Sequence, residues 1–249
     1  MTARNPFEAP PVASRRGGPA KQPLSRDAIV VEALRQLGSA GLKGMSLRKV
    51  ASALQTGPAS LYAYVNDLDE LHALVLDRAL GQVQLRRTAR ADWRKSLSNL
   101  LGSYARVLSE SPGLAQLAFG IVAVGPNALR ITETLLLLLE EAGVDAATAA
   151  WAVDLLLLYV TAIVAEHAND FGRSGPDQAV AQAIAQAGES EFPHLHAARA
   201  HLLSGSPAQR FAWAIEVLLQ GILKTPRSAS APPAPVRQGR ARKRSTRAD

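Results

Sequence analysis

Apolar side chains recur at helical spacing along most of the chain. Between residues 46 and 54, four apolar residues fall at i, i+3, i+4 and i+7, which places them on one helix face. They are Leu47, Val50, Ala51 and Leu54. No segment shows the strict alternation of a half-buried strand, and β-branched runs are few. The pattern therefore predicts an all-α protein.

Glycine, proline and capping residues divide this pattern into elements. Ser25 and Ser46 have the side chains of helix N-caps, and Gly38 and Gly41 are expected to end the helix that begins after Ser25. Pro58 stands at a first helical position, where its missing N–H has no intrahelical partner to lose. Further helices are expected near residues 58–65, 67–86, 92–110, 113–119, 126–142, 145–170, 176–188, 194–204 and 206–224.

Two short helices joined by a tight, glycine-containing turn, with a third helix in front, describe a helix-turn-helix unit. In the segment LQTGPASLYAYV, Leu61 and Val65 lie four residues apart and are expected to point inward. Tyr62 and Tyr64 then flank the helix, where a phenol can donate to a phosphate oxygen of DNA. The alternative is that both rings cover neighbouring helices.

The net charge of +7 is unevenly distributed. Residues 1–24 carry +3, residues 25–66 carry +3, residues 67–224 carry −5 and residues 225–249 carry +6. A basic front and tail suit a polyanionic partner, although solvated tails are often basic without any target. Both ends are rich in Pro, Ala, Gly or Arg without periodicity, so we predict a disordered basic arm over 1–24 and a disordered basic tail over 225–249.

The sequence also excludes several classes of protein. It has no cysteine, hence no disulfide framework, and none of the common phosphate-loop, nucleophile-elbow or zinc-protease motifs, so we expect no enzyme. His194, His196 and His201 have loose spacing without a matching acid, so no metal site and no cofactor is predicted. The longest apolar run is about half a membrane span, and no apolar signal core is found at the front, which predicts a soluble, cytoplasmic protein without a membrane partner.

The segment SLRKVASALQTGPASLYAYVNDLDEL resembles the DNA-binding domain of the tetracycline-repressor (TetR) family, with Leu61-Tyr62-Ala63-Tyr64 in the family's motif. The later chain is similar to the members closest to the tetracycline repressor itself. SPGLAQLA, the long helix with Trp151, EFPHLHAA and FAWAIEVLLQGIL occur in the expected order. The resemblance implies a helix-turn-helix DNA-binding domain over residues 25–66 and a helical ligand-binding and dimerisation domain over residues 67–224.

The resemblance also implies roles for individual residues. Arg48 matches a position that reads a base edge, and an arginine fork can pair with guanine for roughly 1–3 kcal/mol of discrimination. Pro58 and Ala59 match positions that touch bases through apolar contact. Ser46, Ser60, Tyr62 and Tyr64 match phosphate contacts.

Two positions depart from the family pattern. Tyr64 stands where a histidine is frequent, and Leu68 stands where a lysine usually contacts phosphate. The loss of one phosphate contact should weaken binding and lower its salt dependence. The hypothesis is that the basic ends compensate, through Arg15, Arg16 and Lys21 as a minor-groove arm and through the tail residues Arg240, Arg242, Lys243 and Arg244.

For the larger second domain, the resemblance implies a homodimer and a small-molecule effector, which we expect to be largely apolar. The expected pocket residues are Tyr104, Phe119, Trp151, Tyr159 and His167, each of which could instead be an ordinary core residue. The expected dimer surface uses two apolar helices. Its residues are Ala152, Leu155, Leu156, Tyr159 and Ile163 on 145–170, and Phe211, Ile215, Leu218, Leu219 and Ile222 on 206–224.

These features together predict a ligand-responsive transcriptional regulator, most simply a repressor, that binds a near-palindromic double-stranded operator as a homodimer. Two other readings of the sequence stay open. One is a basic helical protein that binds nucleic acid without sequence preference through its tails. The other is a helical dimerisation module whose N-terminal domain no longer binds DNA.

Overall fold

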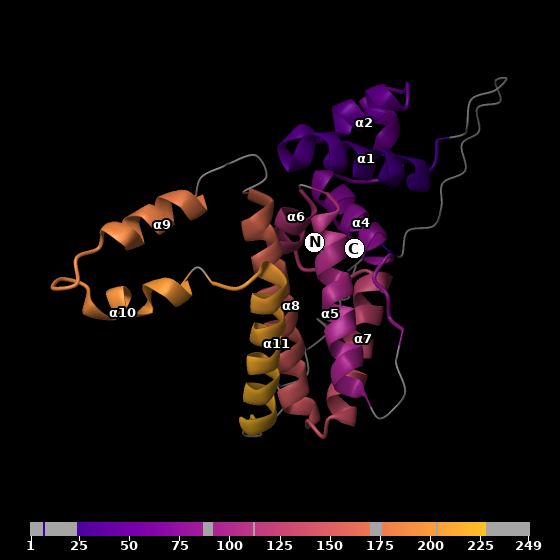
Figure 1. Ribbon diagram of the computed structural model, residues 1–249. Coiled ribbons are helices and arrows are strands. Elements are labelled where there is room, and N and C mark those ends of the chain that lie inside the picture. Colours follow the sequence, from indigo (N-terminus) through magenta and orange to yellow (C-terminus); the bar gives the residue numbers. More distant parts are fainter. Residues whose placement is uncertain are drawn as a thin grey trace, which may run out of the picture.

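The computed structural model describes residue 7 and residues 24–86, 92–111, 113–169, 176–202 and 204–227. In these residues the chain forms eleven helices and no strand, as the sequence predicts (Figure 1). Apart from residues 7 and 24, the predicted basic arm, with Arg15, Arg16 and Lys21, lies outside the described residues. The tail beyond Arg227, with the basic residues 240–244, also lies outside them.

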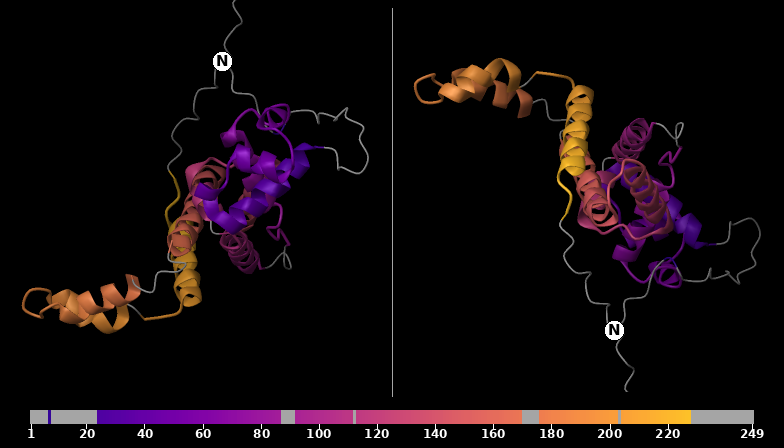
Figure 2. Two further views of the ribbon diagram at one scale, coloured as in Figure 1. Left: turned by 90° about the horizontal axis from the view of Figure 1, so that it is seen from above. Right: turned by 90° about the horizontal axis from the view of Figure 1, so that it is seen from below.

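The helices fall into three groups (Figures 1 and 2). The head consists of α1 (Arg26–Gly44), α2 (Leu47–Ala53) and α3 (Pro58–Leu61). The body consists of α4 (Leu68–Leu80), α5 (Trp93–Ser109), α6 (Leu114–Gly120), α7 (Pro126–Glu141), α8 (Ala146–Asn169) and α11 (Pro207–Lys224). The third group, α9 (Pro176–Gln186) and α10 (Pro193–Leu202), forms a hairpin that projects from the body.

Local capping explains why the head helices begin where they do. The Ser25 hydroxyl accepts the backbone N–H of Ala28 at 3.1 Å, and the Ser46 hydroxyl accepts that of Lys49 at 3.3 Å. Both bonds satisfy donors that a helix leaves without partners at its first turn. The two predicted N-caps are confirmed.

Of the two glycines expected to end the first helix, Gly38 lies inside α1, whereas Gly41 breaks it with φ 67° and ψ −177°, as predicted. One further turn then carries the chain to Gly44. The end predicted for the next helix but one is wrong. The helix that begins at Pro58 stops at Leu61 rather than near Val65. Tight bonds from the Tyr64 and Val65 N–H groups to the Leu61 carbonyl, at 2.8 and 3.0 Å, still close the chain into a helix-like turn.

α4 connects the head to the body. Asp67 caps it by accepting the Glu70 N–H at 2.7 Å, but the described contacts include no return bond from the Asp67 N–H to the Glu70 carboxylate. The Glu70 carboxylate instead accepts the Asn66 N–H at 2.9 Å and pairs with Arg26 of α1. α4 ends at Leu80, so the helix predicted over 67–86 is shorter than expected.

α8 is the central helix of the body and packs against α5, α6, α7 and α11. Over Ala146–His167 its mean hydropathy is 1.9, and within the described residues it is the one helix long and apolar enough by composition to cross a membrane. Its buried face, with Leu156 and Val160 fully inaccessible, forms part of the core. We therefore interpret α8 as the core helix of a helical bundle.

Two glycines give a matched test of the packing between head and body. A Cβ on Gly113, at the start of α6, would lie 2.5 Å from Leu37 Cδ1 and 2.6 Å from the Leu42 nitrogen of α1. A Cβ on Gly102, inside α5, would meet no atom within 4 Å. Gly113→Ala should lower the free energy of unfolding by about 1–3 kcal/mol through overpacking. Gly102→Ala should raise it by about 0.5–1 kcal/mol through helix propensity. Urea denaturation measures both, and equal effects from the two variants would contradict the close approach of α1 and α6.

Candidate nucleic-acid interface and effector region

We call residues 58–65 the recognition segment. Most of its predicted contact residues face solvent, whereas the two residues expected to point inward are buried. Leu61 and Val65 are buried at 0% and 1% exposure, whereas Tyr62 is 56% exposed. Pro58 and Ala59 are also exposed. Tyr64 is half-buried and packs against the core, so the two tyrosines have different environments. The backbone thus holds one large aromatic ring in water at the end of α3.

The same surface continues onto α2, where Arg48 is exposed. Most other basic groups of the head are engaged. Arg26 pairs with Glu70, Arg35 with Glu32 at 2.8 Å, and Lys49 donates to the Gly44 carbonyl at 2.7 Å. Arg48 has no ion-pair partner among the described residues, which leaves its guanidinium available to an external acceptor.

The start of α4 adds negative charge beside this surface. Asp69 has a side-chain exposure of 94%, and Asp67 holds the N-cap. Leu68 is partly buried and packs against the core, so it supplies no phosphate contact. Leu68 therefore acts as a packing residue at the position where the family usually has a phosphate-binding lysine.

The turn between α2 and α3 contains a residue that the sequence reading did not single out. Gln55 adopts φ 52°, and among the described residues no other non-glycine residue has a positive φ. Its N–H bonds to the Ser52 carbonyl and the Thr56 N–H to the Ala51 carbonyl, both at 2.9 Å. This bond pair is the Schellman motif, in which glycine normally takes the position that Gln55 occupies. The missing glycine concealed the type of this turn in the sequence.

The five residues expected to contact an effector lie in different environments. Tyr104 of α5 is 7% exposed, and its hydroxyl hydrogen-bonds to Thr161 of α8 at 2.9 Å. Burial raises the pKa of the Tyr104 phenol, so the hydroxyl stays protonated. Tyr159 faces α11, where its ring stacks on Phe211 at 6.4 Å between centroids. Of the five, Tyr104 is thus the one placed deep inside the body.

The other three expected residues are exposed. Phe119 and Trp151 are 61% and 63% exposed. The guanidinium of Arg227 lies 4.0 Å from the centroid of the Trp151 ring. His167 lies near the end of α8 with Nδ1 2.6 Å from the Ile163 carbonyl oxygen. As placed, these residues do not converge with Tyr104 on one described cavity, and their roles remain predictions.

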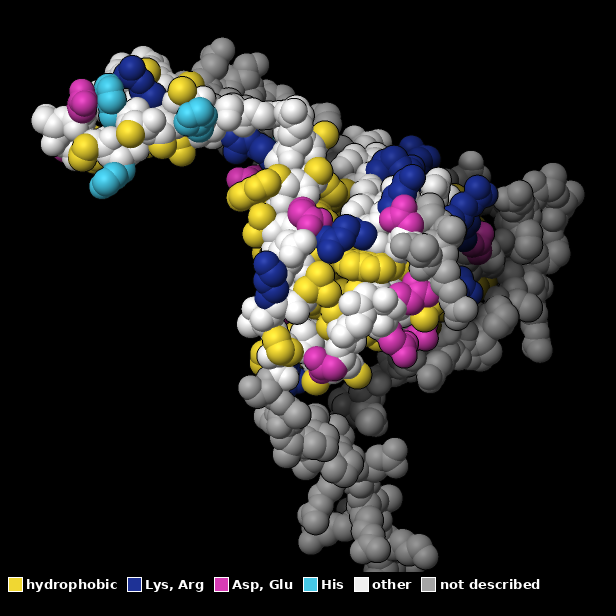
Figure 3. Space-filling model, turned by 60° about the horizontal axis from the view of Figure 1, so that its bottom comes forward, with side chains coloured by type: hydrophobic (Ala, Val, Ile, Leu, Met, Phe, Trp, Pro, Cys, Tyr) yellow, Lys and Arg dark blue, Asp and Glu magenta, His cyan; other side chains and the backbone are white. Residues whose placement is uncertain are grey.

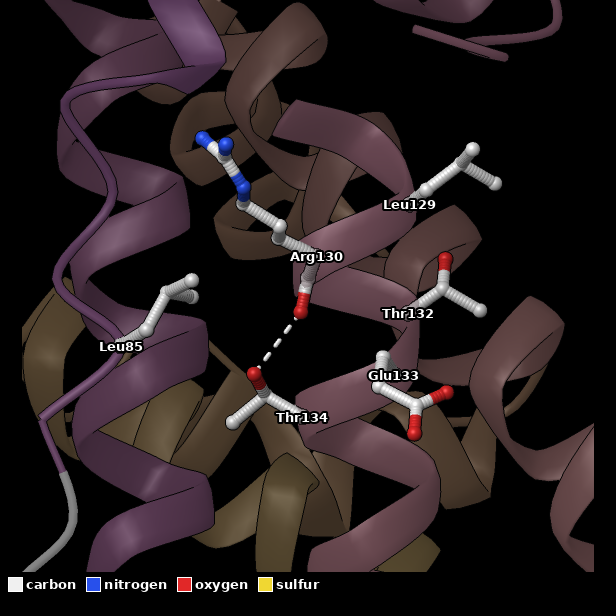
Figure 4. A pocket seen from close by; sticks show the side chains of 6 residues that line it. All are labelled: Leu85, Leu129, Arg130, Thr132, Glu133 and Thr134. Carbon is white, nitrogen blue, oxygen red and sulfur yellow. Dashed lines mark hydrogen bonds between the residues drawn. The ribbon is translucent and has the colours of Figure 1, made fainter. Parts of the chain in front are cut away.

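A surface hollow of about 490 Å³ lies along α7 and the segment that follows α4 (Figure 4). None of the residues predicted to bind an effector lines it. Its described lining residues are Leu85, Leu129, Arg130, Thr132, Glu133 and Thr134. The Thr134 hydroxyl donates to the Arg130 carbonyl at 2.7 Å, so this polar group is already satisfied.

The histidines of α10 do not assemble a metal site with their described neighbours. His196 lies 3.8 Å from Glu189 and 3.5 Å from Arg199. In the described part of the chain, no group of three or more His, Cys, Asp or Glu side chains could hold a metal ion.

Comparisons with known proteins agree with this architecture. The family model for the tetracyclin repressor-like C-terminal domain matches residues 87–225. An HTH-type transcriptional regulator of Saccharopolyspora erythraea is 32% identical over 175 residues, which is 69% of this chain and 73% of the relative. The HTH-type transcriptional repressor DrrR1 of Streptomyces coeruleorubidus is 34% identical over 128 residues, 49% of this chain and 46% of DrrR1.

Among solved structures, apo ActR from Streptomyces coelicolor superposes with a TM-score of 0.76 at 32% identity, covering 82% of this chain and 97% of ActR. ActR has also been solved in complex with actinorhodin. The fold and the exposed recognition segment define a helix-turn-helix transcriptional regulator. Within that class, the chain belongs to the tetracycline-repressor (TetR) family.

The left-handed Gln55 yields a test of local strain. Gln55→Gly removes the steric conflict of a side chain at φ 52°, and the expected gain in the free energy of unfolding is about 0.5–1 kcal/mol. Thermal or urea denaturation measures it. Gln82→Gly is a control, because Gln82 follows α4 without a positive φ, and it should not stabilise. If Gln55→Gly instead lowers the free energy of unfolding, the contacts of the Gln55 side chain stabilise the fold by more than the left-handed backbone destabilises it.

Proposed function

We propose that this regulator is a ligand-responsive repressor that binds a near-palindromic operator as a homodimer in the cytoplasm. Its reading head spans residues 25–66, and its effector and dimerisation body spans residues 67–224. The observation that carries the proposal is the recognition segment, in which Leu61 and Val65 are buried while Tyr62 stays 56% exposed. A ring kept in water after α3 and an exposed Arg48 on the neighbouring α2 suit contact with a nucleic acid.

The proposed contacts divide into base reading and positioning. Arg48 would bond to a guanine edge, while Pro58 and Ala59 would meet apolar base surface in the major groove. Ser46, Ser60, Tyr62 and Tyr64 would contact phosphates and fix the register of the head. The half-buried ring of Tyr64 leaves its contribution smaller than that of Tyr62. The acidic start of α4 would limit the approach of further phosphates.

The proposed dimer surface is the exposed face of α8 and α11. The sequence assigned Ala152, Leu156, Ile215, Leu219 and Ile222 to this surface, but all five are buried in the monomer core. Beside them lie apolar residues that remain exposed in the single chain, namely Trp151, Leu155, Leu158, Trp213 and Val217. Hydrophobic side chains gather on the α11 side of the body below the projecting hairpin (Figure 3). A twofold copy of the chain would cover such a face and pair two heads for a palindrome.

The proposed effector is a small, largely apolar molecule that binds in the body. ActR, solved with actinorhodin, supports a ligand-binding role for this fold. Tyr104 is its proposed central contact, with the Tyr104–Thr161 hydroxyl pair as a polar group inside an apolar region. Phe119, Trp151, Tyr159 and His167 stay predicted contacts, but Trp151 and His167 lie near opposite ends of α8, so one small molecule would not reach both. The effector would release the operator if it bound more tightly to a conformer whose heads no longer fit both half-sites.

Loss of the Arg48 fork should weaken operator preference. With fragments selected from genomic DNA, Arg48→Ala should lose roughly 1–3 kcal/mol of discrimination between the selected site and random DNA. Arg35→Ala, on the exposed side of α1, is the matched control and should bind as the wild type does. Fluorescence anisotropy at fixed salt measures both.

Truncation after Arg227 separates specific binding from binding through the tail. A specific reader should keep its site preference in the truncated chain and lose only non-specific affinity. If Arg48→Ala leaves binding unchanged while the truncation abolishes it, the chain is a non-specific basic binder and the proposed function is wrong.

The dimer surface has its own test. Leu158→Asp, 52% exposed in the single chain, would bury a charge in the proposed interface and should raise the dimer dissociation constant by roughly tenfold or more. Leu129→Asp, 59% exposed on α7, is the control and should remain dimeric. Sedimentation velocity over a dilution series distinguishes them. A dimer unaffected by Leu158→Asp would exclude this face.

A further inference from the structure

Helix α7 has no capping side chain of its own. Its N-cap is Gly125, and Pro126 follows as the first helical residue. The carboxylate of Asp77, near the end of α4, takes this role across a sequence distance of 50 residues. Asp77 Oδ1 accepts the backbone N–H of Asn127 at 2.9 Å and that of Ala128 at 3.1 Å.

The Asn127 side chain completes the joint from the other direction. Its amide nitrogen donates to Asp77 Oδ2 at 2.9 Å and to the Asp77 carbonyl oxygen at 3.0 Å. Asp77 is only 6% exposed. The hydrogen bonds that its buried carboxylate accepts therefore come from the start of α7. Charge-assisted bonds to N–H groups at the positive end of a helix are stronger than neutral ones.

Close approach of the backbones makes this joint specific. A Cβ on Gly125 would lie 2.2 Å from Asp77 Cγ, so no larger residue fits there without displacing the carboxylate. A Cβ on Gly81, at the end of α4, would lie 3.3 Å from the Asn127 amide nitrogen. Glycine therefore allows contact on both sides of the Asp77–Asn127 pair.

The neighbouring residue ties the same turn of α4 to the head. Arg78 pairs with Asp27 in the first turn of α1, and Glu70, two turns earlier, pairs with Arg26. One turn of α4 is thus bonded to the head through Arg78 and to the body through Asp77. Any rotation of α4 relative to α7 must break the buried bonds of Asp77.

We propose that Asp77 is a positioning residue for DNA reading: by capping α7 it fixes the orientation of the head relative to the body. This inference rests on the proposed function, since orientation matters only if two heads must fit one operator. Without the Asp77 carboxylate the α4–α7 joint loosens, and the heads sample orientations that do not match both half-sites. Asp77 itself touches no DNA.

Asp145 provides a matched control for mere loss of a helix cap. It caps α8 by accepting the N–H groups of Ala147 and Thr148, at 3.0 and 3.1 Å, and the Thr148 hydroxyl at 2.6 Å. Its bonds resemble those of Asp77 in number and kind, but all of them stay within one helix start. Asp77→Ala and Asp145→Ala therefore both remove a cap, and only the first uncouples α4 from α7.

The test measures the distance between head and body directly. Because the sequence has no cysteine, Arg35→Cys on α1 and Glu140→Cys on α7 accept two spin labels without background. Labelled chain diluted into unlabelled chain gives the intramolecular distance distribution by double electron–electron resonance. Asp77→Ala should broaden or shift this distribution, and Asp145→Ala should leave it unchanged.

The functional readout is the affinity of the unlabelled proteins for the selected fragment. Asp77→Ala should weaken it about tenfold, a typical size for coupling between sites, and Asp145→Ala should not. If Asp77→Ala fails to fold, Asp77→Asn keeps the shape but sets an amide donor against the Asn127 amide, and should give the same result in weaker form.

Two failures are distinguishable. An unchanged distance distribution in the Asp77 variants overturns the positioning role, whatever the DNA result. If the distance distribution changes but the wild-type protein selects no near-palindromic fragment, Asp77 still positions α4 against α7, and it is the proposed function that is overturned.

Discussion

One continuous hydrophobic core joins the head of this protein to its body. Leu61 and Val65 of the recognition segment belong to the same buried cluster as Leu71 and Val75 of α4 and Leu156 of α8. Close packing makes such a core resistant to gradual deformation, so the head and the body constrain each other's positions. The exposed recognition surface, the engaged basic groups around Arg48 and the cap on α7 all depend on this shared core for their relative positions.

Local signals in the sequence were sufficient for most of the secondary structure. Ser25, Ser46 and Pro58 mark helix starts because each acts on backbone groups within four residues. Helix ends were less predictable, since the short α3 depends on how Leu61 packs. The turn between α2 and α3 was predictable, but the left-handed conformation of Gln55 within it was not, because that conformation is normally associated with glycine.

The placement of apolar residues could be predicted only as far as helix faces. Leu155 and Leu156 are chemically identical, yet the second is fully buried and the first is 43% exposed. Which of them meets a partner depends on the angle at which α8 crosses its neighbours, and spacing contains no such information. Asp77 was overlooked for a related reason, because an acid on a helix normally indicates a solvated face and its partner lies 50 residues away.

α11 ends at the side of the body that lies away from α1 and α2 (Figure 1), and Arg227, the last described residue, follows it closely in the sequence. Its N–H donates to the Thr148 hydroxyl at 2.8 Å, and its guanidinium covers the Trp151 ring at the start of α8. The described part of the chain therefore ends at the pole opposite the recognition segment. A fluorescent protein or an immobilisation tag joined after this anchor would leave the DNA-reading end unobstructed, whereas one joined ahead of α1 would begin beside it.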